Sequence, residues 1–313
     1  MDTVTLGRTG LRVGVAGLGC GGFSRLGLGT GGSEANAIRV VRTALDLGVN
    51  LLDTAAAYRT ECVVGQAIAD VPRDQVVIAT KAHATGTSPK DVVASLHASL
   101  RRLRTDYVDI FQLHGVPPTD YARCRDVILP ALLRERDAGR LRHIGITETA
   151  PRDPEHSMLR QALDDGVWDT VMVAFHMLHQ NARGTVFPRS MDKRIGTLLM
   201  FAVRRIFARP AMLAATLADL AQSGQLPHGA DQADPLGFLL HPGGAASMTE
   251  AAYRFVRHEP GVDVVLFGTG NPAHVEQNVA ALLAPPLPAA DHGRLVSLFG
   301  HLVGIGLDRP PAR

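Results

Sequence analysis

The sequence predicts an α/β fold, a (β/α)8 (TIM) barrel preceded by a short N-terminal β-hairpin. Short apolar segments that fit buried strands alternate with segments of helical periodicity, at a spacing of about 30 residues. Several strand segments are continuously apolar, as strands of a parallel sheet covered on both faces are. The stretch 21–32 is too long for the glycine motif that leads directly into a helix in open doubly wound sheets. We therefore expect residues 1–313 to form a single barrel domain.

The individual elements follow from the pattern in chain order. Residues 3–15 alternate around the turn Gly7–Gly10, which predicts the hairpin. Strands are expected at Val15–Cys20, Asn50–Asp53, Val76–Lys81, Tyr107–His114, Leu141–Thr147, Thr170–Phe175, Ile195–Met200 and Val262–Phe267. Helices are expected at Glu34–Leu47, Glu61–Ala69, Pro89–Arg102, Tyr121–Ala138, Pro154–Asp165, Ala211–Ala221, Met248–His258, Pro272–Leu283 and His292–Val303. A long loop is expected at Gln180–Arg194.

Composition excludes several classes of protein. Hydrophobic residues make up 46% and charged residues 20% of the chain, as in soluble proteins with a substantial core. A net charge of +2 with 5% aromatic residues does not indicate a nucleic-acid-binding protein. No apolar run approaches about 18 residues and the N-terminus does not resemble a signal peptide, so we expect a cytoplasmic protein without a membrane span. Three scattered cysteines indicate neither a disulfide framework nor a metal site.

Polar residues stand at the ends of three consecutive predicted strands. Asp53, Lys81 and His114 end the second, third and fourth strands, and Tyr58 follows Asp53 closely. Because active sites of such barrels lie at the carboxyl ends of the strands, we expect these four side chains to converge. A nearby ammonium group lowers the pKa of a phenol, a carboxylate holds the ammonium in place, and an imidazole N–H can stabilise a developing oxyanion. The set suits protonation of a carbonyl oxygen while hydride reaches the carbon.

Each of these residues also has a structural interpretation. Asp53 could cap a turn with Tyr58 packed at a helix start. Lys81 could be a solvated strand end, and His114 a hydrogen-bonded loop residue. Their convergence on one face of a barrel favours a functional site.

The end of the last strand has the character of an anion-binding site. Glycines at 268 and 270 end the strand, and Asn271 is placed to cap the helix that Pro272 begins. Unpaired N–H groups and the positive helix end would then face the barrel mouth. A well-capped helix without a ligand is the alternative interpretation.

Several motifs together resemble the aldo-keto reductases over nearly the whole chain. The motifs are Asp53-Thr-Ala-x-x-Tyr58 with Glu61 and Gly65, Ile78-Ala-Thr-Lys81, Asp106–His114, Gly139–Gly145, and Gly268-Thr-Gly-Asn-Pro-x-His274 with Asn278. The resemblance implies a barrel that binds NADPH across its mouth, with NADP(H) preferred to NAD(H). It implies Tyr58 as the general acid, Lys81 and Asp53 as the groups that tune it, and His114 as the group that orients the carbonyl.

The chain departs from the family pattern mainly where the cofactor is held. Arg59 stands where a glycine usually follows the tyrosine. Thr147-Glu148 replaces the Ser-Asn pair that holds the nicotinamide amide, Met172 replaces a glutamine with the same role, and Met200 or Phe201 replaces a tyrosine that stacks on the nicotinamide ring. His274 replaces an arginine that binds the 2′-phosphate, and Gln277 replaces an acidic residue. Cofactor contacts are therefore expected at Gly19, Cys20, Thr147, Glu148, Met172, Met200, Phe201, Gly268, Thr269, Gly270, Asn271, His274, Gln277 and Asn278.

The expected function is NAD(P)H-dependent reduction of an aldehyde or ketone, or the reverse oxidation. Two alternatives remain: a nucleotide-binding sensor or regulatory subunit of the same fold, and a lyase or isomerase without net hydride transfer. The substrate is expected to be a small molecule, and the sequence predicts neither its identity nor the oligomeric state. Loops expected to line the substrate pocket are Gly21–Gly32, Ala82–Ser88, Gly115–Thr119 and Gln180–Arg194. Substrate contacts are expected from Phe23, Arg59 and His83, and an apolar wall from Phe187.

Overall fold

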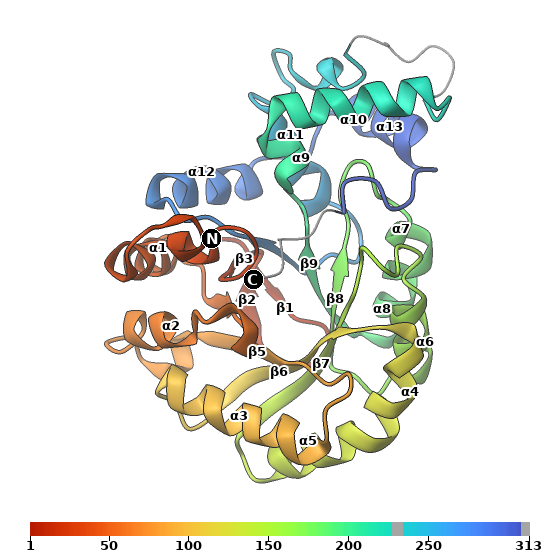
Figure 1. Cartoon of the computed structure of the whole chain (residues 1–313). Helices are drawn as coiled ribbons and strands as arrows, with labels where there is room; N and C mark the ends of the chain where they lie inside the picture. The colour runs from red at the N-terminus through yellow and green to blue at the C-terminus, as the bar shows by residue number, and fades with distance from the viewer. Residues whose placement is uncertain (227–233, 308–313) are drawn as a thin grey trace.

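The computed structural model describes residues 1–226 and 234–307, and it contains the predicted closed barrel. Its parallel strands follow one another in the order β10-β3-β4-β5-β6-β7-β8-β9. The strands are β3 Ala16–Gly19, β4 Leu51–Asp53, β5 Val77–Ala82, β6 Val108–Val116, β7 Leu141–Glu148, β8 Thr170–Ala174, β9 Gly196–Met200 and β10 Val264–Phe267. Figure 1 shows the barrel with its ring of helices, and the predicted fold class is confirmed.

The helices largely occupy the predicted segments. They are α1 Glu34–Asp46, α2 Glu61–Ala67, α3 Pro89–Leu103, α4 Tyr121–Arg123, α5 Leu129–Asp137, α6 Ser157–Asp165, α7 Ala182–Thr185, α8 Phe187–Lys193, α9 Arg205–Ala208, α10 Pro210–Gln222, α11 Met248–Arg257, α12 Pro272–Leu283 and α13 Ala289–Phe299. The helix expected over Tyr121–Ala138 is α4 and α5 joined by a π-helical turn, Cys124–Ile128. None of the helices in the described ranges is long and apolar enough to cross a membrane.

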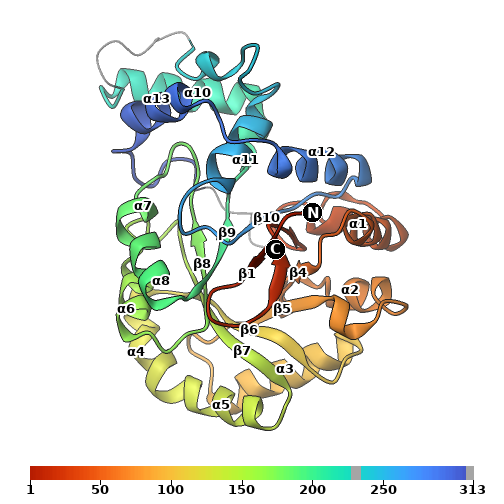
Figure 2. The same ribbon diagram turned by 180° about the vertical axis from the view of Figure 1, so that it is seen from behind.

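The N-terminal hairpin seals one end of the barrel. Strands β1 (Thr3–Thr5) and β2 (Arg12–Gly14) pair antiparallel as predicted. Figure 2 shows the hairpin across the barrel end, where Leu6 and Val13 join the apolar side chains of the barrel interior. Gly7 has a φ of +48°, and a Cβ there would lie 2.2 Å from the backbone nitrogen of Gly196, so only glycine fits. The carboxyl ends of the strands are therefore the open end.

The predicted long loop at Gln180–Arg194 is wrong. Most of this segment forms α7 and α8, which belong to the ring of helices after β8. Phe187 is accordingly no wall of a substrate pocket: it is 1% exposed and packs edge-on against Phe175, 5.2 Å between ring centroids. Gly184 and Pro188 interrupt the periodicity, and two helices of 4 and 7 residues are too short for a periodic pattern to reveal.

The helices between β9 and β10 extend beyond the ring (Figure 1). Helix α9 contacts both α10 and α11, and α11 in turn packs against α12. This arrangement adds a wall to one side of the barrel mouth.

Candidate active site

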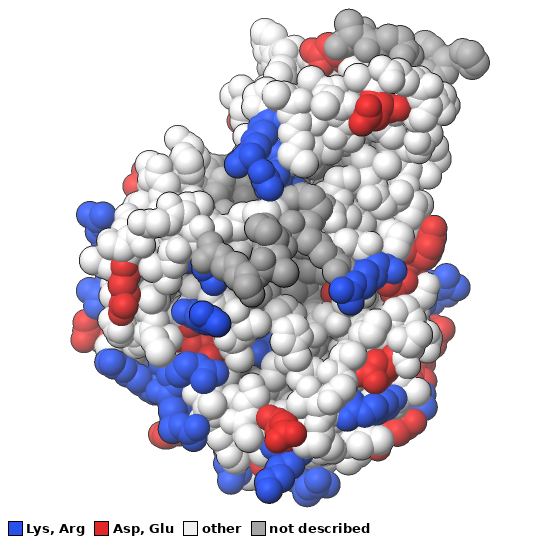
Figure 3. Space-filling model, in the orientation of Figure 1, with Lys and Arg blue, Asp and Glu red and all other residues white. Residues whose placement is uncertain are grey.

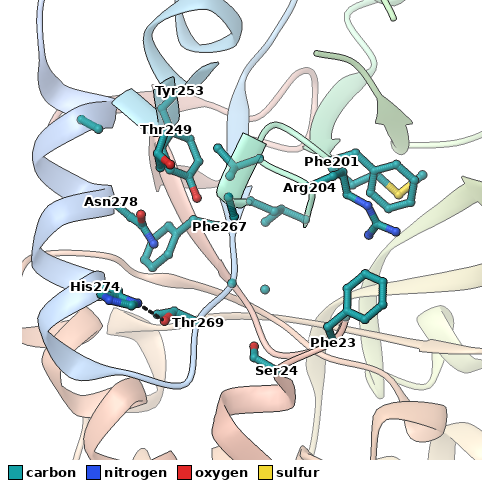
Figure 4. A pocket seen from close by; sticks show the side chains of 18 of the residues that line it. Phe23, Ser24, Phe201, Arg204, Thr249, Tyr253, Phe267, Thr269, His274 and Asn278 are labelled. Atoms are coloured by element: carbon teal, nitrogen blue, oxygen red, sulfur yellow. Dashed lines mark hydrogen bonds between the residues drawn. The ribbon is translucent and has the colours of Figure 1, made fainter. Parts of the chain in front are cut away.

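A cavity of about 980 Å³ opens at the carboxyl ends of the strands. Its walls come from the loop after β3, from the ends of β4, β8, β9 and β10, and from α9, α11 and α12. Figure 4 shows part of the lining, with side chains from the first loop facing those of α11 and α12. Its volume lies at the upper end of the range for small-molecule and cofactor sites.

A buried ion pair forms the floor of the cavity. The Lys81 ammonium donates to both carboxylate oxygens of Asp53 at 2.7 Å and to the carbonyl oxygen of Thr54 at 2.9 Å. Both side chains are buried, Lys81 completely. They meet because β4 and β5 are neighbouring parallel strands and both residues lie at carboxyl ends. The Gln112 amide on β6 adds a hydrogen bond to Asp53 at 3.3 Å.

Tyr58 lies above this pair in a short 3₁₀ turn, Ala56–Tyr58, after β4. The Lys81 nitrogen is 5.1 Å from the centroid of the phenol ring. Gly21 covers the ring from the other side, since a Cβ there would lie only 2.4 Å from Cε2 of Tyr58. A larger residue at position 21 would displace the phenol, so the glycine is part of the site.

His114 completes the set from the end of β6. Its Nε2 lies 3.3 Å from the Tyr58 hydroxyl, and the two rings meet edge to face. His83 stacks on the imidazole with ring centroids 4.9 Å apart and an interplanar angle of 12°. The four residues that the sequence predicts to converge are thus in contact with one another.

Burial governs the protonation of these groups. Burial raises the pKa of Tyr58 above its usual value, although the charge of Lys81 acts to lower it, so the phenol is protonated near neutral pH. The lysine therefore contributes in the expected direction, but the net shift is opposite to the expected one. Burial alone would lower the pKa of Lys81, but Asp53 and Tyr58 more than offset this and raise it. Burial, with the charge of Lys81, lowers the pKa of His114 well below its usual value, so the imidazole is neutral.

Most of the residues expected to hold a cofactor line the cavity. They are Gly19, Met172, Met200, Phe201, Gly268, Thr269, His274, Gln277 and Asn278. Phe23, expected to contact substrate, lines it as well. The methionines come from β8 and β9, and Phe201 directly follows β9. Gly19 ends β3, Phe23 lies in the loop after it, and the other residues come from the end of β10 and the first turns of α12.

Other expected contacts lie outside the cavity lining. Cys20 is fully buried in the hydrophobic core. Gly270 packs against Gly27 of the first loop, Asn271 caps α12 through its side chain, and the Thr147 hydroxyl accepts a hydrogen bond from the Gly115 N–H at 2.7 Å.

Glu148 is also directed away from the cavity. Its carboxylate contacts Nδ1 of His156 at 2.7 Å and accepts a hydrogen bond from the Ala174 N–H at 2.7 Å. Burial alone would lower the pKa of His156, but the charge of Glu148 and the hydrogen bonds to Glu148 and Asn181 together raise it above its usual value. The pair ties the β7 end to the start of α6 and to β8, which is a structural role.

Arg59 and His83 do not line the cavity where substrate contacts were expected. His83 reaches the site only by stacking on His114. Arg59 adopts a left-handed φ of 60°, and its side chain lines a separate hollow between α2 and α3 with Cys62, Ser95 and Arg102. Figure 3 shows Lys and Arg side chains gathered on this side of the molecule. The left-handed backbone, which glycine adopts without cost, turns the side chain outward.

Two groups of residues line the cavity without having been predicted from the sequence. Arg204 and Arg205 follow β9: the Arg204 guanidinium stacks 3.8 Å from the Phe201 centroid, and that of Arg205 lies 4.8 Å from the Phe23 centroid. The other group is on α11, where Ser247, Thr249, Glu250 and Tyr253 face the cavity. The capping pattern Ser247-x-x-Glu250 reveals the helix start, but not that α11 covers the mouth.

Residues 17–299 match the model of the Aldo/keto reductase family. The chain belongs to the aldo/keto reductase family. The resemblance noted from the motifs is thereby confirmed.

The aldo/keto reductase relatives differ in how much of the chain they match. An aldo-keto reductase, YhdN of Bacillus subtilis, is 28% identical over 81% of this chain and 83% of its own length. Methylglyoxal reductase DkgB of Salmonella typhi is 42% identical, but over 35% of this chain and 42% of its own length. A Klebsiella pneumoniae aldo/keto reductase solved with NADP and acetate has a TM-score of 0.68 at 23% identity, covering 99% of this chain and 96% of that one. The structural likeness supports the fold.

Proposed function

We propose that this aldo/keto reductase reduces an aldehyde or ketone to an alcohol with a reduced nicotinamide cofactor, and that Tyr58 is the general acid. The observation that carries the proposal is the Tyr58 hydroxyl, held 3.3 Å from a neutral His114 and next to the buried Lys81–Asp53 pair. A sensor that only binds nucleotide has no use for a phenol held in this way.

The lining of the cavity fits a dinucleotide. Met172 and Met200 offer an apolar surface for the nicotinamide beside Tyr58. The N-terminus of α12 and Arg205, whose buried Nε has no hydrogen-bond partner among the described residues, suit the phosphates. When bound, the cofactor supplies the hydride to the carbonyl carbon.

The chain's own residues handle the proton. A carbonyl oxygen between the Tyr58 hydroxyl and Nε2 of His114 accepts a hydrogen bond from each when the imidazole carries its proton on Nε2. As the oxygen gains negative charge, the O–H bond of Tyr58 breaks and the proton passes to the substrate oxygen. The resulting phenolate is stabilised by the Lys81 ammonium, and solvent then returns a proton to it. In the reverse direction the phenolate must accept a proton, so oxidation should rise with pH.

The substrate pocket favours a small carbonyl compound with an apolar part. Phe23 and Phe201 form its apolar walls beside Tyr58, and Leu307 packs behind Met200 and Phe201. The relative that is 42% identical over 35% of this chain is named methylglyoxal reductase. Methylglyoxal is therefore the first compound to test. A cytoplasmic location and a single-domain organisation accompany the proposal as predictions.

The proposal is tested with a panel of carbonyl compounds, including methylglyoxal and aromatic aldehydes. Each is supplied with NADH and, separately, with NADPH, and the loss of reduced-nicotinamide absorbance is followed. We expect turnover of at least one aldehyde. Tight nucleotide binding without oxidation by any compound would instead favour the regulatory alternative.

A further inference from the structure

The cavity extends away from Tyr58 into an arm between α11 and α12. Thr249, Glu250 and Tyr253 line this arm from α11, and Gln277 and Asn278 line it from α12. Small apolar residues at the C-terminal part of α12, Ala280, Ala281 and Ala284, also line the cavity. Figure 4 shows Thr249, Tyr253 and Asn278 gathered on one side of the cavity and Arg204 with Phe201 on the opposite side. The arm therefore combines a flat aromatic surface with amide, hydroxyl and carboxylate groups.

The arm is poor in positive charge. Among the described residues that line the cavity, the arginines are Arg204 and Arg205, and both stack on phenylalanines of the opposite side. Arg254, next to the arm, is engaged by the carbonyl oxygens of Gly244, Pro285 and Pro286 and by Glu250. His274 lies against the Thr269 hydroxyl, with its Nδ1 at 3.5 Å.

The carboxylate of Glu250 is fixed by its surroundings. Its Oε1 accepts a hydrogen bond from Arg254 at 2.9 Å and its Oε2 one from the Ala246 N–H at 3.2 Å. The Ser247 hydroxyl accepts from the Glu250 N–H and caps the start of α11. Each carboxylate oxygen keeps a lone pair for another donor.

We infer that this arm receives an adenosine whose ribose carries no 2′-phosphate, so that the protein binds NAD(H) in preference to NADP(H). The inference rests on the proposed function, in which Tyr58 fixes the reacting end and leaves the adenosine for the far arm. Ribose hydroxyls donate hydrogen bonds to carboxylate and amide oxygens, and acidic residues accept such bonds in NAD-binding folds. A 2′-phosphate would bring a charge of about −1.5 to −2 beside Glu250, and no arginine is among the described residues that line the arm. The preference is opposite to the NADP(H) expected from the family resemblance.

Calorimetric titration tests the preference without relying on turnover. NADH and NADPH are compared first, then 5′-AMP and 2′,5′-ADP (adenosine 2′,5′-bisphosphate), which differ only in the 2′-phosphate. We expect NADH and 5′-AMP each to bind at least about tenfold more tightly than the counterpart that carries the 2′-phosphate, since charge-assisted hydrogen bonds contribute on this scale. Equal or tighter binding of NADPH overturns the inference and leaves the proposed function intact. No binding of either dinucleotide overturns both.

The variant Glu250→Gln tests whether this carboxylate sets the preference. The backbone N–H at position 250 still donates to Ser247, and the single side-chain oxygen of glutamine can accept from the Ala246 N–H. Arg254 keeps its bonds to the carbonyl oxygens of Gly244, Pro285 and Pro286, so the fold is retained while the negative charge is removed. We expect the ratio of the 2′,5′-ADP and 5′-AMP dissociation constants to fall about threefold or more, on the scale of one screened charge interaction. Glu276→Gln, on the exposed face of α12 outside the cavity, is the matched control and should leave the ratio unchanged. An unchanged ratio in Glu250→Gln would contradict the assignment.

Discussion

The two sides of the barrel mouth differ in which elements supply their polar side chains. On the side of β4, β5 and β6, each polar residue ends a strand and contacts the next, so the strands themselves fix the distances within the site. On the side of β7 and β8, the strand ends carry Glu148, which binds His156, and the apolar Met172. The polar groups that remain for a cofactor come instead from α9, α11 and α12, which lie outside the ring of strands (Figure 1). The comparison indicates that cofactor contacts can be rebuilt without disturbing the proton-transfer groups.

The largest effect is expected when the ion pair of the first side is broken. Lys81→Met leaves Asp53 buried without its partner, so the free energy of unfolding should fall by about 3–5 kcal/mol. Turnover should fall about 10²- to 10⁴-fold, because the tyrosine loses the charge that stabilises its phenolate. Denaturant unfolding and initial rates measure the two effects.

A double variant separates stability from chemistry in this pair. Lys81→Met with Asp53→Asn removes both charges and should recover much of the lost stability but none of the turnover. Parent-level turnover in the double variant would show that the pair is only structural.

On the other side, Glu148→Gln should affect stability and not cofactor affinity. The loss of a charge-assisted bond to His156 should cost about 2 kcal/mol. The pKa of His156 is raised in the folded state, so this stabilisation is fully present below the usual value of 6.5 and disappears as pH rises through the raised pKa. The destabilisation should therefore be larger at pH 6 than at high pH. Glu155→Gln, at an exposed neighbouring position, is the control, and a large change in nucleotide affinity in Glu148→Gln alone would restore its predicted cofactor role.

Behind β8, His179 should make the fold sensitive to acid. Burial, with the charge of His156, lowers the pKa of His179 from 6.5 to about 3. Below pH 6.5 the unfolded chain binds a proton at this histidine that the folded protein does not. The free energy of unfolding should therefore decrease as the pH is lowered, by about 2 kcal/mol between pH 6.5 and 5 at 1.36 kcal/mol per pH unit. His179→Asn keeps an acceptor for the Gly304 N–H and should flatten this dependence in denaturant unfolding, whereas exposed His258→Asn should not. Identical pH profiles for parent and His179→Asn would show that this group does not titrate on unfolding.

The smallest effect is expected at Arg59. Because its φ of 60° suits glycine, Arg59→Gly should raise the free energy of unfolding by about 0.5–1 kcal/mol. Arg104, with a φ of 56° at the end of α3, should show a similar gain as Arg104→Gly. Turnover and KM should not change. An increase in KM confined to Arg59→Gly would show that Arg59 does contact the substrate.

The difference between the two sides also explains what could be predicted from the sequence. The carboxyl ends of the strands converge in any such barrel, so the order of the predicted strands in the sequence was enough to predict that Tyr58, Lys81 and His114 lie close together. Helix α12 occupies the predicted residues because Asn271 and Pro272 mark its start locally. These features depend on short-range signals.

The remaining features depend on long-range packing. Whether Glu148 faces the cavity or His156 is decided by which face of β7 its side chain takes, and sequence spacing alone does not fix this. Arg204, Arg205 and Glu250 line the cavity because α9 and α11 fold over the mouth, an arrangement without a local signal. The net pKa of Tyr58 likewise depends on how completely the phenol is buried.

The most direct test of the account is the first turnover of Tyr58→Phe, measured by rapid mixing with saturating cofactor and an accepted aldehyde. The variant keeps the ring that packs under Gly21 and removes only the hydroxyl. We predict that the rate of cofactor oxidation falls about 10²- to 10⁴-fold while the nucleotide dissociation constant stays the same. Tyr107→Phe, outside the cavity, should match the parent. A first turnover in Tyr58→Phe as fast as in the parent would contradict the assignment of Tyr58 as the proton donor.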